Sequence, residues 1–184
     1  MAEVDQAVVV ELVGNAHGNL VRVRELLDAH PEALNARAPW NETAVEAAAQ
    51  VGNKPILELL IGRGAPVDFF TACVLGRTEQ VAADLVDDPG RANARGVHEL
   101  PALYFAAIGG STAIADLLLA AGADVNARAE AAAPIHGAVM GEKEEMVRLL
   151  LEKGADPLLP DFEGRSARQL AEKIGRNDLA ELFE

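Results

Sequence analysis

Hydrophobic residues recur along this chain with the period of an α-helix. Three segments carry them at positions i, i+3 and i+4, namely Ile56, Leu59 and Leu60, then Ile114, Leu117 and Leu118, then Met146, Leu149 and Leu150. This spacing predicts amphipathic helices with one apolar stripe each. A short segment rich in small residues precedes each of them, with alanine pairs at 48, 49 and at 106, 107, and predicts a second helix. The pattern therefore predicts an all-α protein built from helix pairs.

The small residues and the glycines indicate how these pairs are assembled. Alanine side chains are small enough to let neighbouring helices approach closely. A single helix pair cannot bury its apolar faces by itself, so it must stack against another pair. Gly64, Gly122 and Gly154 follow the leucine-rich segments. A left-handed residue is common just past a helix end, and glycine adopts that conformation at the lowest cost. We therefore expect a stack of similar units.

Three stretches of the chain nearly superimpose. They are TAVEAAAQVGNKPILELLIGRGAPVD (43–68), PALYFAAIGGSTAIADLLLAAGADVN (101–126) and APIHGAVMGEKEEMVRLLLEKGADPL (133–158). They resemble ankyrin repeats, whose signature runs T-P-L-H-x-A-A, then Gly, then a V-x-x-L-L helix, then G-A-D-V-N. The resemblance implies an ankyrin-repeat solenoid of stacked helix-turn-helix units, joined by short β-hairpin or loop fingers.

Weaker units complete the stack at both ends and in the middle. We predict one domain, 1–184, of six repeats with approximate bounds 3–37, 38–67, 68–95, 96–128, 129–160 and 161–184. The first and last are expected to act as caps, because a stack otherwise ends on a bare apolar face.

One interval between repeats is short. Gly18, Gly52, Gly76 and Gly110 are separated by 34, 24 and 34 residues. The missing length is roughly one hairpin, so we predict that the finger between repeats 2 and 3 is absent. In this stretch, VDFFTACVLG (67–76), the single cysteine, Cys73, replaces an alanine of the tight helix contact. A buried cysteine there is expected to act as a small hydrophobic residue.

The charge balance narrows the class of partner. The sequence contains 16 Lys and Arg residues and 29 Asp and Glu residues, for a net charge of -13. This excess repels nucleic acid and anionic membrane surfaces and attracts a basic protein segment. No window reaches the roughly 18 consecutive apolar residues of a membrane helix, and the N-terminus lacks the basic segment of a secretion signal. We expect an intracellular, cytoplasmic protein.

Motifs for catalysis or metal binding are absent from the sequence. Ser111 and Ser166 lie at expected helix starts, where a hydroxyl caps free N–H groups. The four histidines have no metal-ligand spacing, so we predict no catalytic residue, no metal and no cofactor. The resemblance implies that His136, in APIH, bridges finger and helix by hydrogen bonds. Two charges, Asp84 and Arg168, fall in register with core leucines and are anomalous.

The resemblance also implies two binding surfaces, the fingertips and the concave face of the first helices. The positions just before the glycine of each middle unit point into that face and carry an apolar stripe: Val51, Val74, Leu75, Ile108 and Met140. The fingertips carry Trp40, Glu42, His98, Glu99, Glu130, Phe162 and Glu163. Our candidate binding residues are therefore Trp40, Val51, Val74, Leu75, His98, Tyr104, Ile108 and Met140.

Three functional hypotheses follow. The first is a non-catalytic interaction module, a scaffold or stoichiometric inhibitor, that holds a basic or amphipathic protein segment in the concave groove. The alternative is a small-molecule or catalytic pocket beside the missing hairpin, with Asp84, His98, Tyr104 and His136 as polar groups and Cys73 behind them. Self-association through the apolar stripe is the third.

Overall fold

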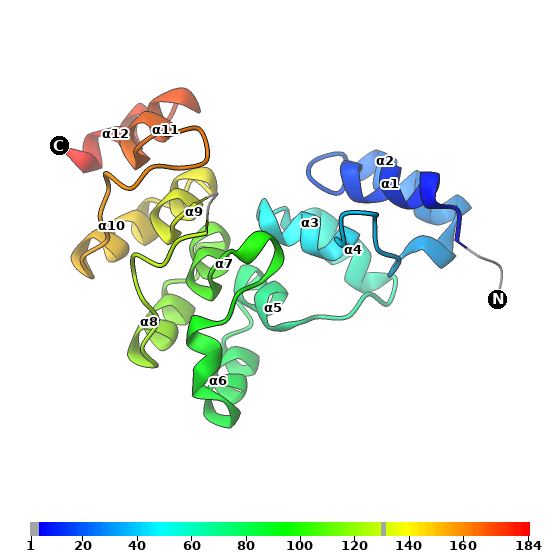
Figure 1. Ribbon diagram of the computed structural model, residues 1–184, viewed down its shortest axis with the longest axis horizontal. Helices are drawn as coiled ribbons and strands as arrows, with labels where there is room; N and C mark the ends of the chain where they lie inside the picture. The colour runs from blue at the N-terminus through cyan, green and yellow to red at the C-terminus, as the bar shows by residue number, and fades with distance from the viewer. Residues whose placement is uncertain (1–3, 130–131) are drawn as a thin grey trace. The chain divides into compact units, whose positions relative to one another are not determined.

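The computed structural model describes residues 4–129 and 132–184. The chain divides into two compact units, Met1–Thr71 and Ala72–Glu184, and we describe each by itself. Both consist of antiparallel helix pairs that follow one another along the chain (Figure 1). The grouping of six repeats into one domain stays a prediction.

The first unit contains two helix pairs. Its helices are α1 (Gln6–Asn15), α2 (Leu20–Ala29), α3 (Ala44–Gln50) and α4 (Lys54–Gly62), with a short 3-10 turn η1 (Pro31–Ala33). Side chains at the helix starts accept hydrogen bonds from free backbone N–H groups, as Thr43 does from the N–H of Glu46. Alanines 44, 47, 48 and 49 of α3 are all buried, which is the close packing that the small residues predict.

The second unit contains the remaining elements, and helix α5 (Phe69–Leu75) crosses the boundary between the units. The others are α6 (Thr78–Asp87), η2 (Pro89–Asn93), η3 (Val97–Glu99), α7 (Ala102–Gly109), α8 (Thr112–Ala120), α9 (Pro134–Met140), α10 (Glu144–Glu152), α11 (Ala167–Lys173), α12 (Asn177–Ala180) and η4 (Glu181–Phe183). Ser111 and Ser166 cap α8 and α11. Their predicted capping role is confirmed.

The connections confirm the missing finger. Residues 63–68 alone join α4 to α5, whereas residues 88–101 join α6 to α7 and residues 153–166 join α10 to α11. Within the described ranges the fingers form no strand, and one isolated β-bridge joins Arg95 and Pro101. The fold is thus an all-α solenoid with loop-like fingers.

Side chains of one finger bind the backbone of the next repeat in the second unit. Asn93 donates to the carbonyl of Gly122 at 2.9 Å and accepts from the N–H of Asp124 at 3.3 Å. Asn126 repeats both bonds one unit later, with Gly154 and Asp156. Since a carboxamide supplies a donor and an acceptor together, each asparagine fixes the register of two neighbouring repeats.

The two anomalous charges do not lie in the core. Asp84 is half-buried and pairs with Arg91 at 3.3 Å, while the buried residues of α6 are Val81 and Leu85. Arg168 is exposed, and its Nε lies 3.0 Å from a carboxylate oxygen of Glu172. The predicted core register was wrong for both, because each helix turns the charged position towards solvent.

Candidate interaction surfaces

Neighbouring first helices of the second unit touch backbone to backbone. A Cβ on Gly109 would collide with the backbone of Val74, and one on Gly141 would collide with the backbone of Ile108. This approach leaves Val74 at 0% and Ile108 at 2% exposure. The prediction that the apolar stripe is exposed was therefore wrong at these two positions, since the next repeat covers each of them.

Tyr104 is buried by the same stacking. A Cβ on Gly137 would lie 2.9 Å from the Tyr104 ring, so the glycine lets α9 close over it. The phenol donates to the sulfur of Met140 at 3.8 Å. Burial raises the pKa of Tyr104 well above its ordinary value, so the hydroxyl stays neutral. Tyr104 therefore contacts Met140 from the buried side and is not itself a surface residue.

Met140 is the member of the stripe that stays exposed. Its exposed fraction is 41%, equal to that of Ile174, which directly follows α11 and occupies the position held by Gly109 and Gly141 in the preceding repeats. Helices α9 and α11 are in contact. We call Met140, Ile174 and Phe162, an exposed residue of the finger before α11, the α9–α11 surface.

Ion pairs border this surface. Glu142, in the turn after α9, has a left-handed φ of 56° and pairs with Arg176 at 2.6 Å. Glu163, in the finger, pairs with Lys173 at the end of α11 at 3.0 Å. These bonds tie the finger and the helix ends together, so the apolar side chains lie in a polar frame.

The finger that carries Phe162 is braced from within. Asp161 is buried and accepts hydrogen bonds from the backbone N–H groups of Glu163 and Arg165 and from the Arg165 guanidinium. Burial opposes ionisation of Asp161, but these bonds outweigh it and lower its pKa. The guanidinium carbon of Arg165 lies 5.7 Å from the centre of the Phe162 ring, and Phe162 remains 67% exposed.

The finger of the first unit presents the only tryptophan of the sequence. Trp40 is 49% exposed, and its indole N–H donates to Glu42 at 2.6 Å. Glu42 itself is buried, so it holds the ring and is not the exposed fingertip residue that we predicted. His98 is exposed in its finger, with a left-handed φ of 54°. Val51 and Leu75 are half-buried, and Glu130 lies outside the described residues.

The polar groups of the alternative pocket have separate environments. Asp84 binds Arg91, and His98 stands on an exposed finger. Cys73 is buried, as predicted. His136 is buried too, and its Nδ1 accepts from the N–H of Ala133 at 3.0 Å, which confirms its structural role. Burial lowers the pKa of His136, so its ring is neutral at physiological pH.

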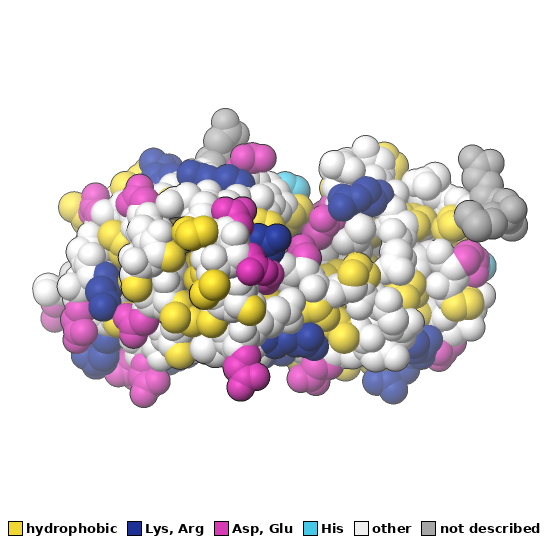
Figure 2. All heavy atoms as spheres, turned by 90° about the horizontal axis from the view of Figure 1, so that it is seen from below, with side chains coloured by type: hydrophobic (Ala, Val, Ile, Leu, Met, Phe, Trp, Pro, Cys, Tyr) yellow, Lys and Arg dark blue, Asp and Glu magenta, His cyan; other side chains and the backbone are white. Residues whose placement is uncertain are grey.

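Charge is spread over the surface of both units. Figure 2 shows acidic and basic side chains interspersed on the visible face, with hydrophobic side chains between them. Acidic residues exceed basic ones in each unit, with ten against five in residues 1–71. The acidic excess attracts cationic segments, and the face in Figure 2 carries no single dominant charged patch.

A family model for ankyrin repeats in three copies matches residues 69–161. The chain belongs to the ankyrin-repeat family. Its helix pairs, its glycine-ended helices and the His136 hydrogen bond agree with that membership. Ankyrin repeats are generally protein–protein interaction modules, and the family is typically non-catalytic.

Two curated proteins are similar to parts of this ankyrin-repeat chain. BCL-6 corepressor-like protein 1 of Homo sapiens is 35% identical over 127 residues, which cover 68% of this chain and 7% of that protein. Potassium channel AKT1 of Arabidopsis thaliana is 40% identical over 68 residues, 37% of this chain and 8% of that protein. The alignments thus span under a tenth of either relative.

Two further observations concern membranes and metals. Along the described stretches no helix is both long enough and apolar enough to span a bilayer. Within the same residues, no group of three or more His, Cys, Asp or Glu side chains is arranged to hold a metal ion.

Proposed function

We propose that this ankyrin-repeat chain is a non-catalytic module that binds a basic, amphipathic segment of a protein partner, with the α9–α11 surface as its main contact. The observation that carries the proposal is the 41% exposure of Met140, whose equivalents Val74 and Ile108 are buried, together with the 41% exposure of Ile174 one position further along the repeat. Exposed apolar groups inside a polar frame are typical of interaction sites.

The chemistry of the frame defines the segment that fits. Glu142 and Glu163 lie beside the apolar side chains, and their carboxylates are exposed enough to meet a second cation. Apolar side chains of the partner would contact Met140, Ile174 and the exposed ring of Phe162, while its Lys or Arg would be steered by the net charge of -13. Trp40 is a further candidate contact, on the finger of the first unit.

Site-specific photo-crosslinking in extract of the native host tests this proposal. A benzoylphenylalanine at position 140 should crosslink one partner, and the same group at Val86, an 81% exposed position of α6, should not. The double variant Met140→Glu and Ile174→Glu should lose that partner, whereas Val86→Glu should keep it. Equal capture from both positions, or unchanged capture by the double variant, would exclude the α9–α11 surface.

The same variants address self-association. If the surface joins two copies of this chain, light scattering will show a mass that rises with concentration in the natural sequence and stays monomeric in the double variant. That outcome would contradict binding of a different protein at this surface.

A further inference from the structure

In the second unit, each finger is joined to the next finger by a hydrogen bond from an arginine to a backbone carbonyl. The guanidinium of Arg95 donates to the backbone carbonyl of Arg128 in the next finger at 2.6 Å. Arg128 in turn donates to the carbonyl of Pro160, one finger further, at 2.9 Å. Each arginine therefore holds an extended segment of backbone against its own finger.

Arg37 occupies the equivalent position in the first unit, but its next finger is missing. It keeps the bond within its own finger, to the carbonyl of Asn41 at 2.7 Å, as Arg95 does with Glu99 at 3.0 Å. Its guanidinium turns to Glu46 instead, at 2.9 and 3.1 Å. A guanidinium has five N–H donors, so donors remain for a carbonyl supplied from outside.

Asn35 has also lost the partner that its equivalents bind. The position of Asp124 and Asp156 is occupied here by Pro66, and proline has no backbone N–H to donate. Over the part of the chain that the structure describes, the Asn35 carboxamide makes no hydrogen bond, and the residue is exposed. A donor and an acceptor suited to backbone are therefore left open.

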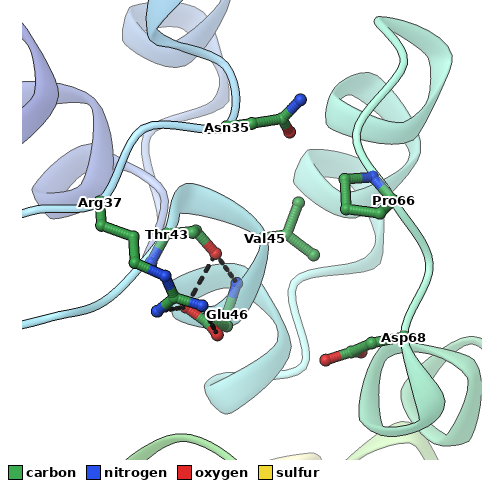
Figure 3. A pocket seen from close by; sticks show the side chains of 7 residues that line it. All are labelled: Asn35, Arg37, Thr43, Val45, Glu46, Pro66 and Asp68. Carbon is green, nitrogen blue, oxygen red and sulfur yellow. Dashed lines mark hydrogen bonds and ion pairs between the residues drawn. The ribbon is translucent and has the colours of Figure 1, made fainter.

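These groups line one pocket of about 280 Å³, which lies wholly in the first unit. Its walls are Asn35, Arg37, Thr43, Val45, Glu46, Pro66 and Asp68. Figure 3 shows Val45 between Asn35 and Asp68, with the Arg37–Glu46 pair at one end. Val45 and Pro66 make an apolar floor between polar walls.

Asp68 gives the pocket its charge. It stands where Asn126 stands in the later repeat, and its Oδ1 accepts from the N–H of Thr71 at 2.7 Å. Because Arg37 and Glu46 neutralise each other, Asp68 is the uncompensated charge of the pocket, in a unit with five basic and ten acidic residues. The pocket therefore attracts a cation.

We propose that this pocket, the vacant-finger site, binds an extended segment of a partner protein that carries Lys or Arg. The segment takes the place of the missing finger, with a backbone carbonyl on Arg37, a backbone amide on Asn35 and its cationic side chain at Asp68. This site is separate from the α9–α11 surface, because all its walls belong to residues 35–68.

A peptide copied from this chain tests the site. The probe is the cyclised peptide of residues 91–101, RANARGVHELP, which has the sequence of an ordinary finger. Cyclisation lowers the entropy lost on binding. Titrated into the isotope-labelled full chain, it should shift the NMR signals of Asn35, Arg37, Asp68 and Thr71. A second peptide with citrulline in place of both arginines should bind more weakly, since it keeps the shape and loses the charge.

Matched variants separate charge from backbone recognition. Asp68→Asn should weaken the arginine peptide about tenfold and leave the citrulline peptide unchanged, because asparagine can still cap the Thr71 N–H. Asn35→Ala should weaken both peptides, since it removes the contact to backbone. Glu58→Gln, an exposed carboxylate of α4, makes the same charge change elsewhere and should alter neither affinity.

The outcomes are decisive and independent of the proposed function. Absence of shifts at these four residues at millimolar peptide would overturn the proposal, as would shifts confined to Met140 and Ile174. A mass that doubles with concentration and is lost in Asn35→Ala would assign the site to a finger of a second copy instead. Crosslinking at position 140 tests the other surface, and its failure leaves this result unaffected.

Discussion

Replacement of Gly141 by alanine tests the close approach that buries Ile108. The new methyl group would lie about 3 Å or less from the backbone carbon, Cα and oxygen of Ile108, which is tighter than ordinary contact. Helices α7 and α9 would have to separate, and overpacking of this kind costs about 1–3 kcal/mol. Loss of the flexible glycine returns about 0.4–1 kcal/mol through the unfolded state. We expect a net destabilisation of about 1–2 kcal/mol.

Thermal unfolding followed by circular dichroism measures this change. For a chain of this size, 1 kcal/mol lowers Tm by about 2–4 °C. The control is Gly62→Ala, at the end of α4, where an added Cβ meets nothing within 4 Å. That variant should gain about 0.4–1 kcal/mol. If Gly141→Ala matches Gly62→Ala, the two helices are not in backbone contact and the explanation for the burial of Ile108 fails.

Three further predictions rest on single residues. Ile108→Glu places a charge at a buried position and should cost about 3 kcal/mol or more in urea unfolding; normal stability would contradict its burial. Burial holds the pKa of His136 below its unfolded value of about 6.5, so the unfolded chain takes up the proton first and the stability of the fold decreases as pH drops through that value. Urea titrations between pH 7.5 and 5 should show a smaller decrease in the free energy of unfolding for His136→Gln than for the natural sequence. Parallel curves for the two proteins would contradict this. Glu142→Gly removes the strain of a left-handed φ but also removes an ion pair with Arg176. The variant should have a Tm a few degrees above that of the natural sequence, and the difference should be larger at 1 M NaCl, where salt screens the ion pair. A variant Tm below that of the natural sequence at high salt would refute this.

The sequence predicted which positions form the candidate site, but it did not predict which of their side chains are exposed to solvent. Positions 74, 108 and 140 are equivalent in the repeat, and all three carry apolar residues. Whether such a side chain is covered depends on the residue that the next repeat sets against it. That residue is Gly109 for Val74 and Gly141 for Ile108, and Ile174 holds the equivalent position in the repeat that follows Met140. The glycines were visible in the sequence, but their contacts with the preceding repeat were not.

The vacant-finger site was missed although its signal was present. The letters NAR occur at 35–37, 93–95 and 126–128. Two residues after the turn glycine, later repeats carry Asp124 and Asp156, whereas the repeat that follows the first NAR carries Pro66. The meaning of this recurrence appears only when the later copies are seen to bond to neighbouring backbone. The pocket predicted from the sequence was placed beside the missing hairpin at Asp84, His98, Tyr104 and His136, whereas the observed pocket lies at Asn35 and Asp68.

The sequence by itself determined the helices, the repeat and the missing finger, because these depend on local spacing. Helical period, glycine ends and the 24-residue interval are properties of the chain taken in order. Tertiary structure alone decided which apolar residues face solvent, where Asp84 and Arg168 find partners, and which hydrogen-bonding groups are left open. Those outcomes depend on the distance between neighbouring repeats. That distance is set by the volume of the side chains that meet across the interface, and the amino-acid sequence alone does not show which side chains meet.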